Sequence, residues 1–271
     1  MRRQLRFMAV VPLLTLGLTA CDEGPADPPS AADCYATGST DFYEPGPFDW
    51  SLEKTGDYDL YVPVEQDGCS AAHLIGFAMG TGAPTSSYTA FYEAFAARGF
   101  MVVVDPANLL NLGGGPLERA LTSAMNDPVF GSRTLKNGVI GHSQGGAAVA
   151  NVALQGDVEV DALVGLMPAL FQGAGRIQAA GLYIGGTEDG FGFATDPVIA
   201  YEKTDGPAFI ADAIGVGHGV GQQQDTLIAM STAWFRCHLA EDDGACGLFR
   251  NSSKDSCAFT GEWAKCEGRN L

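Results

Sequence analysis

Residues 141–145 read G-H-S-Q-G, a pattern in which one serine stands between two glycines. A short apolar stretch precedes the pattern and a run of small residues follows it, which predicts a strand, a sharp turn and a closely packed helix. Gly141 and Gly145 are needed because side chains there would collide with neighbouring backbone. Ser143 is thereby placed at the tip of the turn, where its hydroxyl group can act as a nucleophile.

A serine nucleophile needs a general base, and the sequence contains four histidines. In chains that carry this turn the order is nucleophile, acid, histidine, which excludes His73 and leaves His218 and His238. His238 falls at the end of an expected helix, where a structural role near the negative pole of the helix dipole is favoured. His218 follows an expected strand in a glycine-rich loop, and we predict that it is the base. His142, inside the turn pattern, is expected to pack.

The acid that orients the histidine should lie between Ser143 and His218 in the sequence. Residues 183–189 read Y-I-G-G-T-E-D and place two carboxylates at the end of an expected strand. We predict Asp189 as this acid and keep Glu188 as the alternative. Asp196 and Asp205 are further competitors.

An acyl-transfer site also needs backbone N–H groups that stabilise negative charge on the carbonyl oxygen. One donor is expected from Gln144, the residue directly after the nucleophile. The other is expected from the loop at 79–82, where Thr81 is our choice. No cofactor and no metal are expected in this chemistry.

The elements that would position these residues alternate along the chain. Helices are predicted at 88–98, 116–125 and 227–239, and antiparallel strands at 48–52 and 58–64. Buried strands are predicted at 73–79, 100–104, 138–140, 162–167, 181–184 and 208–213. Strand, helix and strand in succession indicate right-handed crossovers. The expected fold is α/β, with a mostly parallel central sheet and helices on both faces.

Five segments together resemble a known family. They read M-G-T-G-A-P at 79–84, A-R-G-F at 97–100, G-H-S-Q-G-G at 141–146, G-G-T-E-D at 185–189 and A-W-F-R at 233–236. They resemble the cutinase-like, polyester-hydrolase-like esterase branch of the α/β-hydrolase superfamily, which is similar to chlorophyllase-type and dienelactone-hydrolase-type proteins. The resemblance extends from about residue 47 to 248 of the printed sequence. It implies the roles assigned above to Ser143, Asp189, His218, Thr81 and Gln144.

The first residues of the chain have the form of an export signal. Arginines at positions 2, 3 and 6 precede an apolar stretch at 8–19 that is too short to span a bilayer comfortably. The residues 18–21 read L-T-A-C and resemble a bacterial lipobox, so Cys21 is predicted to carry lipid and to anchor the protein to a membrane. Ordinary secretory cleavage is the alternative. We expect an exported bacterial lipoprotein at the cell envelope, on the periplasmic face or the cell surface.

The net charge restricts the possible partners, and the cysteine content agrees with export. The formal net charge of −17 argues against nucleic acid as a partner. Apart from Cys21, six cysteines remain in a chain predicted to leave the reducing cytosol, and disulfides are the expected state. We expect Cys34 to pair with Cys69 and two bridges to form within the late group; metal binding is the alternative. That group is Cys237, Cys246, Cys257 and Cys266.

The expected organisation is a signal peptide at 1–20, a lipidated cysteine with a flexible spacer at 21–46, a catalytic domain at 47–248 and a cysteine-stapled tail at 249–271. We expect a monomer that hydrolyses a small or polymeric carboxylic ester through an acyl-enzyme. An acyltransferase or lactonase with the same triad is one alternative. A surface-binding lipoprotein that has kept the fold without catalysis is another.

Overall fold

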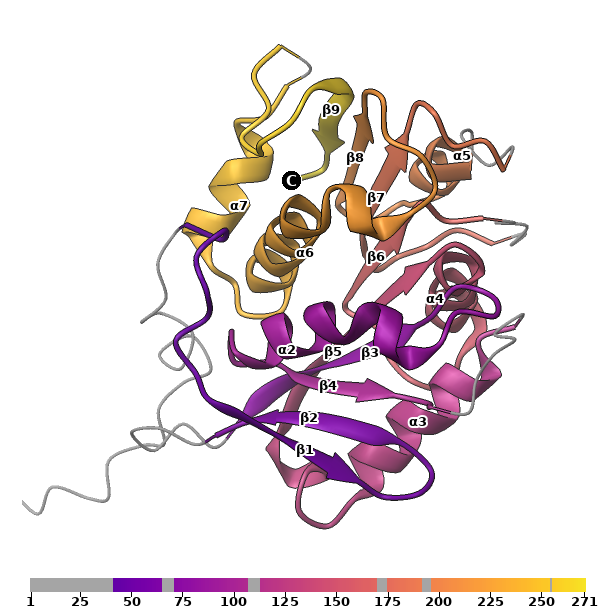
Figure 1. Ribbon diagram of the computed structural model, residues 1–271, viewed down its shortest axis with the longest axis vertical. Helices are drawn as coiled ribbons and strands as arrows, with labels where there is room; N and C mark the ends of the chain where they lie inside the picture. Colours follow the sequence, from indigo (N-terminus) through magenta and orange to yellow (C-terminus); the bar gives the residue numbers. More distant parts are fainter. Residues whose placement is uncertain (1–40, 65–70, 107–112, 170–174, 192–195, 254) are drawn as a thin grey trace, which may run out of the picture.

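Strands of one sheet form the centre of the computed structural model, which describes residues 41–64, 71–106, 113–169, 175–191, 196–253 and 255–271. The sheet has nine strands in the order β1-β2-β4-β3-β5-β6-β7-β8-β9 (Figure 1). Their bounds are β1 Trp50–Lys54, β2 Asp59–Pro63, β3 Ala72–Ala78, β4 Met101–Val104, β5 Thr134–His142, β6 Ala162–Leu166, β7 Ala180–Gly186, β8 Ala208–Ala213 and β9 Trp263–Arg269.

The run of strands from β4 to β8 is joined by parallel pairs, whereas β1, β2 and β9 pair antiparallel at the two sides. Every residue of β3, β4, β6 and β7 is buried. Strands buried on both faces read as continuous apolar runs, which is why these segments were recognisable in the sequence. The prediction of an α/β fold with a mostly parallel sheet is confirmed, and the topology is consistent with that of α/β-hydrolases.

Helices cover both faces of the sheet (Figure 1). The helices on one face are α2 Thr89–Ala96, α6 Gln224–His238 and α7 Asp243–Arg250, and those on the other are α3 Gly115–Asn126, α4 Gln144–Gln155 and α5 Asp196–Glu202. On the first face, a buried cluster joins the sheet to helix side chains such as Phe91, Trp234 and Phe249. The cluster on the other face includes Leu121 and Val149. Short 3₁₀ turns are η1 Thr85–Tyr88, η2 Gly131–Arg133 and η3 Val220–Gln222.

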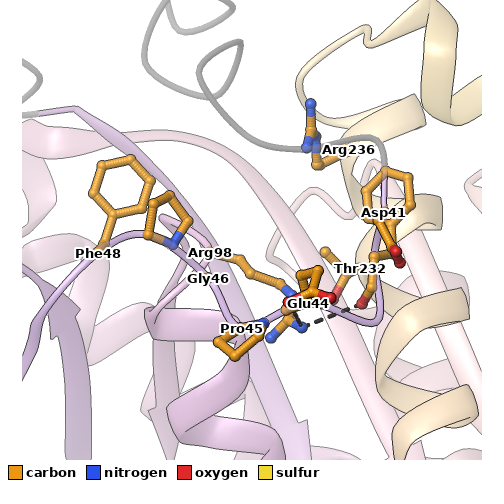
Figure 2. Close-up of a pocket in the computed structure, with 10 residues that line it drawn as sticks. Asp41, Glu44, Pro45, Gly46, Phe48, Arg98, Thr232 and Arg236 are labelled. Carbon is orange, nitrogen blue, oxygen red and sulfur yellow. Dashed lines mark hydrogen bonds between the residues drawn. The ribbon is translucent and has the colours of Figure 1, made fainter.

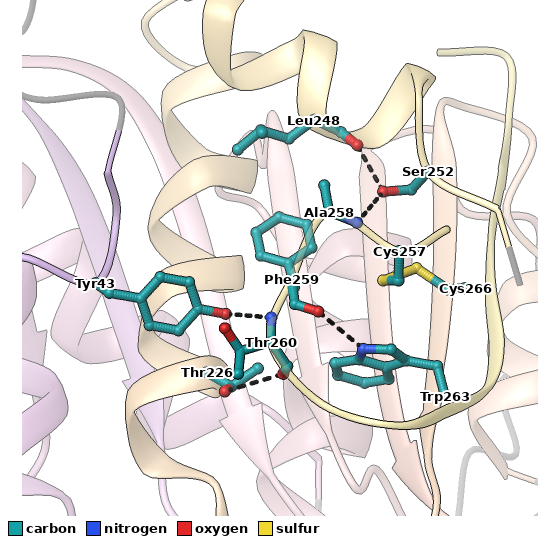
Figure 3. The surroundings of a disulfide bond; sticks show 10 residues. All are labelled: Tyr43, Thr226, Leu248, Ser252, Cys257, Ala258, Phe259, Thr260, Trp263 and Cys266. Carbon is teal, nitrogen blue, oxygen red and sulfur yellow. Dashed lines mark hydrogen bonds between the residues drawn. A yellow bond between two sulfur atoms is a disulfide. The ribbon is translucent and has the colours of Figure 1, made fainter. Parts of the chain in front are cut away.

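The C-terminal segment contains more regular structure than the sequence predicted. Residues at the end of the expected catalytic domain form α7, which is capped by the Asp242 carboxylate, and the expected tail contains the last strand, β9, beside β8. The sequence of β9 contains Lys265, Glu267 and Arg269, and this charge conceals the strand from pattern analysis. The disulfides Cys237–Cys246 and Cys257–Cys266 confirm the prediction of two bridges within the late group. Figure 3 shows the second of them. Cys21, Cys34, Cys69 and the predicted signal peptide and lipid anchor lie outside the described residues.

The segment before β1 contacts α6 and the residues that follow α2. Arg98, which follows α2, donates hydrogen bonds to the carbonyl oxygens of Phe42 at 3.2 Å and Glu44 at 2.6 Å (Figure 2). The guanidinium group of Arg236 lies 5.1 Å from the centre of the Phe42 ring. Both side chains line one pocket, and none of Ser143, Asp189 and His218 lines it.

Candidate active site

The turn between β5 and α4 holds Ser143 in an uncommon backbone conformation. Its φ is 57° and its ψ is −124°, which places a non-glycine residue in a strained region that is typical of functional sites. A Cβ atom on Gly141 would lie 2.1 Å from the carbonyl oxygen of Gly145, and one on Gly145 would lie 2.1 Å from that of Ala78. Both glycines are therefore required by close backbone contact.

Two side chains from other strand ends form a hydrogen-bonded series with Ser143. His218 Nε2 lies 2.8 Å from Ser143 Oγ, and His218 Nδ1 lies 2.7 Å from Asp189 Oδ2. Asp189 follows β7 and His218 follows β8, so the carboxyl ends of parallel strands bring the three residues to one edge of the sheet. The second carboxylate oxygen of Asp189 accepts a hydrogen bond from the Phe191 N–H at 3.1 Å. This chain of groups can carry a proton from Ser143 to His218 while Asp189 fixes the imidazole.

The alternative acids occupy other places. The Asp189 side chain is 2% exposed and that of His218 is 14% exposed, whereas Glu188 is exposed to solvent. Asp205 pairs instead with Arg176, whose Nε donates to it at 2.9 Å, and Asp196 is the first residue of α5.

His238 ends α6, and its ring packs at a tilt against Trp234 with ring centres 4.1 Å apart. Burial lowers its pKa to about 4, so at neutral pH this imidazole is uncharged. Its place at a helix end agrees with the sequence interpretation. Of the two histidines that the chain order allowed, only His218 contacts the nucleophile within the described residues.

The expected oxyanion donors face each other across the turn. Thr81 is the second residue of a β-turn in which Ala83 N–H bonds Gly80 carbonyl oxygen at 3.1 Å, so the turn itself does not use the Thr81 N–H. Gln144 is the first residue of α4, where N–H groups lack intrahelical acceptors. The Thr81 hydroxyl group hydrogen-bonds the side-chain oxygen of Gln144. These positions keep the N–H groups of Thr81 and Gln144 as the candidate oxyanion donors.

His142 and Tyr88 belong to the site although the sequence analysis gave neither a polar role. His142 was expected to pack, but both of its ring nitrogens have hydrogen-bond partners: Tyr88 Oη at 2.8 Å and the carbonyl oxygen of His218 at 2.7 Å. Tyr88 was predicted only as the first residue of the helix at 88–98. No sequence signal pairs residues 54 positions apart, so the contact required the structure.

An exposed apolar ring, that of Phe191, lies beside His218. Phe191 is 69% exposed, and its ring centre lies 4.8 Å from that of His218. An exposed ring beside the imidazole offers apolar contact to a bound molecule. Among the residues that the structure describes, no group of three or more His, Cys, Asp or Glu side chains is arranged to hold a metal ion.

Comparison with known proteins finds no matching family model and no matching curated protein. What is established is therefore the fold, a mixed and mostly parallel α/β sheet with helices on both faces. The described domain has two disulfides, which is typical of proteins outside the reducing cytosol. In the part of the chain that is described, none of the helices is long and apolar enough to cross a bilayer.

Proposed function

We propose that this chain is a serine carboxylic-ester hydrolase of the α/β-hydrolase superfamily, in its cutinase-like branch, anchored outside the cytosol by lipid on Cys21. The observation that carries the proposal is the hydrogen-bonded series Ser143, His218 and Asp189 at a strained strand-to-helix turn. Three groups in this order, with N–H donors beside the serine, form the arrangement that acyl transfer requires.

The reaction has two halves. Ser143 Oγ attacks the ester carbonyl as His218 Nε2 takes the hydroxyl proton, and the oxyanion forms beside the N–H groups of Thr81 and Gln144. His218 then gives the proton to the leaving alcohol, and an acyl-serine remains. Water, activated by His218, releases the acid and restores Ser143. Asp189 keeps Nδ1 protonated and stabilises the imidazolium throughout.

An activated serine can be tested directly. The full chain should be labelled by a fluorophosphonate, and Ser143→Ala should abolish labelling because the probe bonds only to an activated hydroxyl group. Ser132→Ala is the matched control, since Ser132 is an exposed serine in η2 and should leave labelling unchanged. Folded wild-type protein that resists the probe would contradict the proposal and favour a binding role.

The acyl acceptor and the substrate size need a second measurement. We expect hydrolysis of p-nitrophenyl esters over a range of acyl chain lengths, with Phe191 contacting the bound ester. Adding an alcohol acceptor distinguishes hydrolysis from transfer. A new ester formed in preference to free acid would indicate an acyltransferase, and turnover of cyclic esters alone would indicate a lactonase.

A further inference from the structure

A buried series of hydrogen bonds runs behind the nucleophile from one loop to another. Tyr88 Oη accepts from the Gly80 N–H at 3.0 Å, and it lies 2.8 Å from His142 Nδ1. His142 Nε2 lies 2.7 Å from the carbonyl oxygen of His218. Tyr88 is 2% exposed and His142 is also buried. The series therefore joins the loop after β3 to the loop after β8 without passing through solvent.

The partners of His142 fix the position of every proton in this series. A carbonyl oxygen only accepts, so His142 Nε2 must carry the hydrogen that reaches His218. A neutral imidazole has one N–H, which leaves Nδ1 as an acceptor and requires the Tyr88 hydroxyl group to donate to it. The lone pairs of Tyr88 Oη then accept from Gly80. Each donor has one acceptor, and reversing any one bond leaves a buried group unpaired.

The neutral form of His142 is the stable one at this place. Burial lowers its pKa to about 4, although the hydrogen bond to the His218 carbonyl oxygen and the charge of Asp189 act in the opposite direction. A second proton on Nδ1 would face the Tyr88 hydroxyl hydrogen and would have to turn it away. The single arrangement of protons is thus kept at neutral pH.

Packing at the near end of the series is equally restrictive. A Cβ atom on Gly80 would lie 2.9 Å from His142 Nδ1, 3.0 Å from Tyr88 Oη and 3.4 Å from Ser143 Cβ. Gly80 therefore sits directly on the Tyr88–His142 contact and beside the nucleophile. Thr81, whose N–H is an expected oxyanion donor, is the next residue. A shift of Tyr88 or His142 would pass through Gly80 to Thr81.

We propose that His142 is a positioning residue that sets the distance between the oxyanion loop and the base loop, with Tyr88 as its link to Gly80. This inference rests on the proposed function, since it concerns the groups assigned there to the reaction. His142 touches neither the ester nor the reacting oxygen; it holds the backbone of His218 on one side and of Gly80 on the other. Both loops must keep their places around Ser143 for proton transfer and charge stabilisation to coincide.

Two substitutions of His142 each keep one of its two hydrogen bonds. In His142→Gln the amide nitrogen can reach the position of Nε2 and donate to the His218 carbonyl oxygen. In His142→Asn the amide oxygen can take the position of Nδ1 and accept from Tyr88. His142→Leu keeps a similar volume and removes both bonds. Tyr88→Phe removes the link to Gly80 but leaves His142 Nε2 able to donate.

The expected kinetic result separates positioning from simple loss of structure. His142→Leu should lower kcat at least about tenfold with KM little changed, because substrate contacts are kept while the reacting geometry is not. His142→Gln should recover part of kcat, and more so for an ethyl ester than for a p-nitrophenyl ester of the same acid, since the poorer leaving group needs the proton from His218. In the double variant, combining Tyr88→Phe with His142→Leu should lower kcat little further, as expected for residues that act as one unit.

A spectroscopic measurement tests the same inference without activity. In ¹⁵N-histidine NMR of the wild-type protein, the signal that disappears in His142→Gln should show a protonated Nε2 and a bare Nδ1. It should keep that form from about pH 8 to about pH 5.5, whereas an ordinary imidazole titrates near pH 6.5. An Nδ1–H form, or ordinary titration, overturns the proposal.

The esterase assignment and the positioning role of His142 would be contradicted by different results. Absence of fluorophosphonate labelling in wild type would contradict the esterase assignment, while the NMR result would still report on the hydrogen-bond series. Labelling together with a His142→Leu kcat within about twofold of wild type would leave the esterase intact and overturn the positioning role. Circular dichroism of each variant identifies any that does not fold, and the NMR measurement on wild type then decides.

Discussion

Two adjacent carboxylates at the end of β7 have different surroundings. Asp189 turns toward His218 and is nearly buried, whereas Glu188 is exposed and contributes its backbone N–H to Val216 carbonyl oxygen at 3.0 Å. A buried carboxylate at 2.7 Å from the imidazole can hold its tautomer. An exposed one is screened by water and has little effect on a buried ring.

We therefore expect Asp189→Asn to lower kcat by about 10⁴, because an amide favours the wrong imidazole tautomer while leaving the geometry intact. Glu188→Gln is the matched control and should change kcat by less than about threefold. Initial rates on one p-nitrophenyl ester decide between them. A larger loss in Glu188→Gln than in Asp189→Asn would exchange the two assignments.

Residue types and chain order predicted Ser143, His218 and Asp189, with Glu188 as the alternative acid. Sequence could not exclude Glu188 because both carboxylates follow the same strand, and only the turn decides which one is buried. His142 was missed for a different reason. Its type and place in the turn were visible, but its partners come from a 3₁₀ turn and a distant loop, and hydrogen bonding through both nitrogens depends on how these segments meet.

At the scale of elements, the C-terminal segment supplies the last strand of the sheet and is held by a disulfide and by hydrogen bonds. The disulfide Cys257–Cys266 lies between β9 and a loop in which Thr260 N–H bonds Tyr43 Oη at 2.7 Å (Figure 3). Trp263 Nε1 donates to the carbonyl oxygen of Phe259 at 3.1 Å. The C-terminal segment thus contacts both the sheet and the segment that precedes β1.

Replacing Cys257 and Cys266 by alanine should reduce the free energy of unfolding by about 2–3 kcal/mol, since a short loop in the unfolded chain is released. Urea unfolding measures this change, and kcat at 25 °C should stay within about twofold because the triad lies on other loops. The pair Cys237 and Cys246 is the matched control, with the same sequence separation of 9. Loss of activity in the folded Cys257/Cys266 variant would indicate that β9 supports the site.

Strands with continuous apolar runs were predicted within a few residues, whereas β9 and α7 were not predicted at all. The sequence W-A-K-C-E-G-R has no apolar alternation, because a strand at the side of a sheet needs only a few buried residues. In β9 these are Trp263 and Cys266. Its pairing with β8 gives hydrogen-bond partners to N–H and C=O groups of β8 that would otherwise have none in the sheet. The local sequence of β9 contains no signal for this pairing.

On the scale of the whole molecule, three histidines are held uncharged inside the fold. Burial is the main cause that lowers the pKa values of His73, His142 and His238 to about 4, and Lys136 lowers those of His73 and His238 further while Glu241 raises that of His73. In the unfolded chain each titrates near pH 6.5. Between about pH 6.5 and about pH 4 the unfolded state therefore binds more protons, and stability falls as the pH falls.

We expect the free energy of unfolding to decrease from pH 7 to pH 5, by up to about 1.4 kcal/mol per pH unit for each of the three groups. Urea titrations at the two pH values measure the change. His238→Phe should make the decrease smaller, because a phenyl ring can stack on Trp234 and does not titrate. A stability that is constant or rises toward pH 5 would mean that these imidazoles accept protons in the folded state.

The two outermost strands have a consequence for neighbouring copies of the protein. Within the described residues, β1 and β9 each have only one strand partner in the sheet, and both bear charge, including the exposed Glu53 and Lys54 on one side and the exposed Glu267 on the other. Charged side chains on an outermost strand oppose its pairing with another chain. If the proposed lipid anchor concentrated many copies on one membrane, this charge would hinder them from joining into continuous sheets.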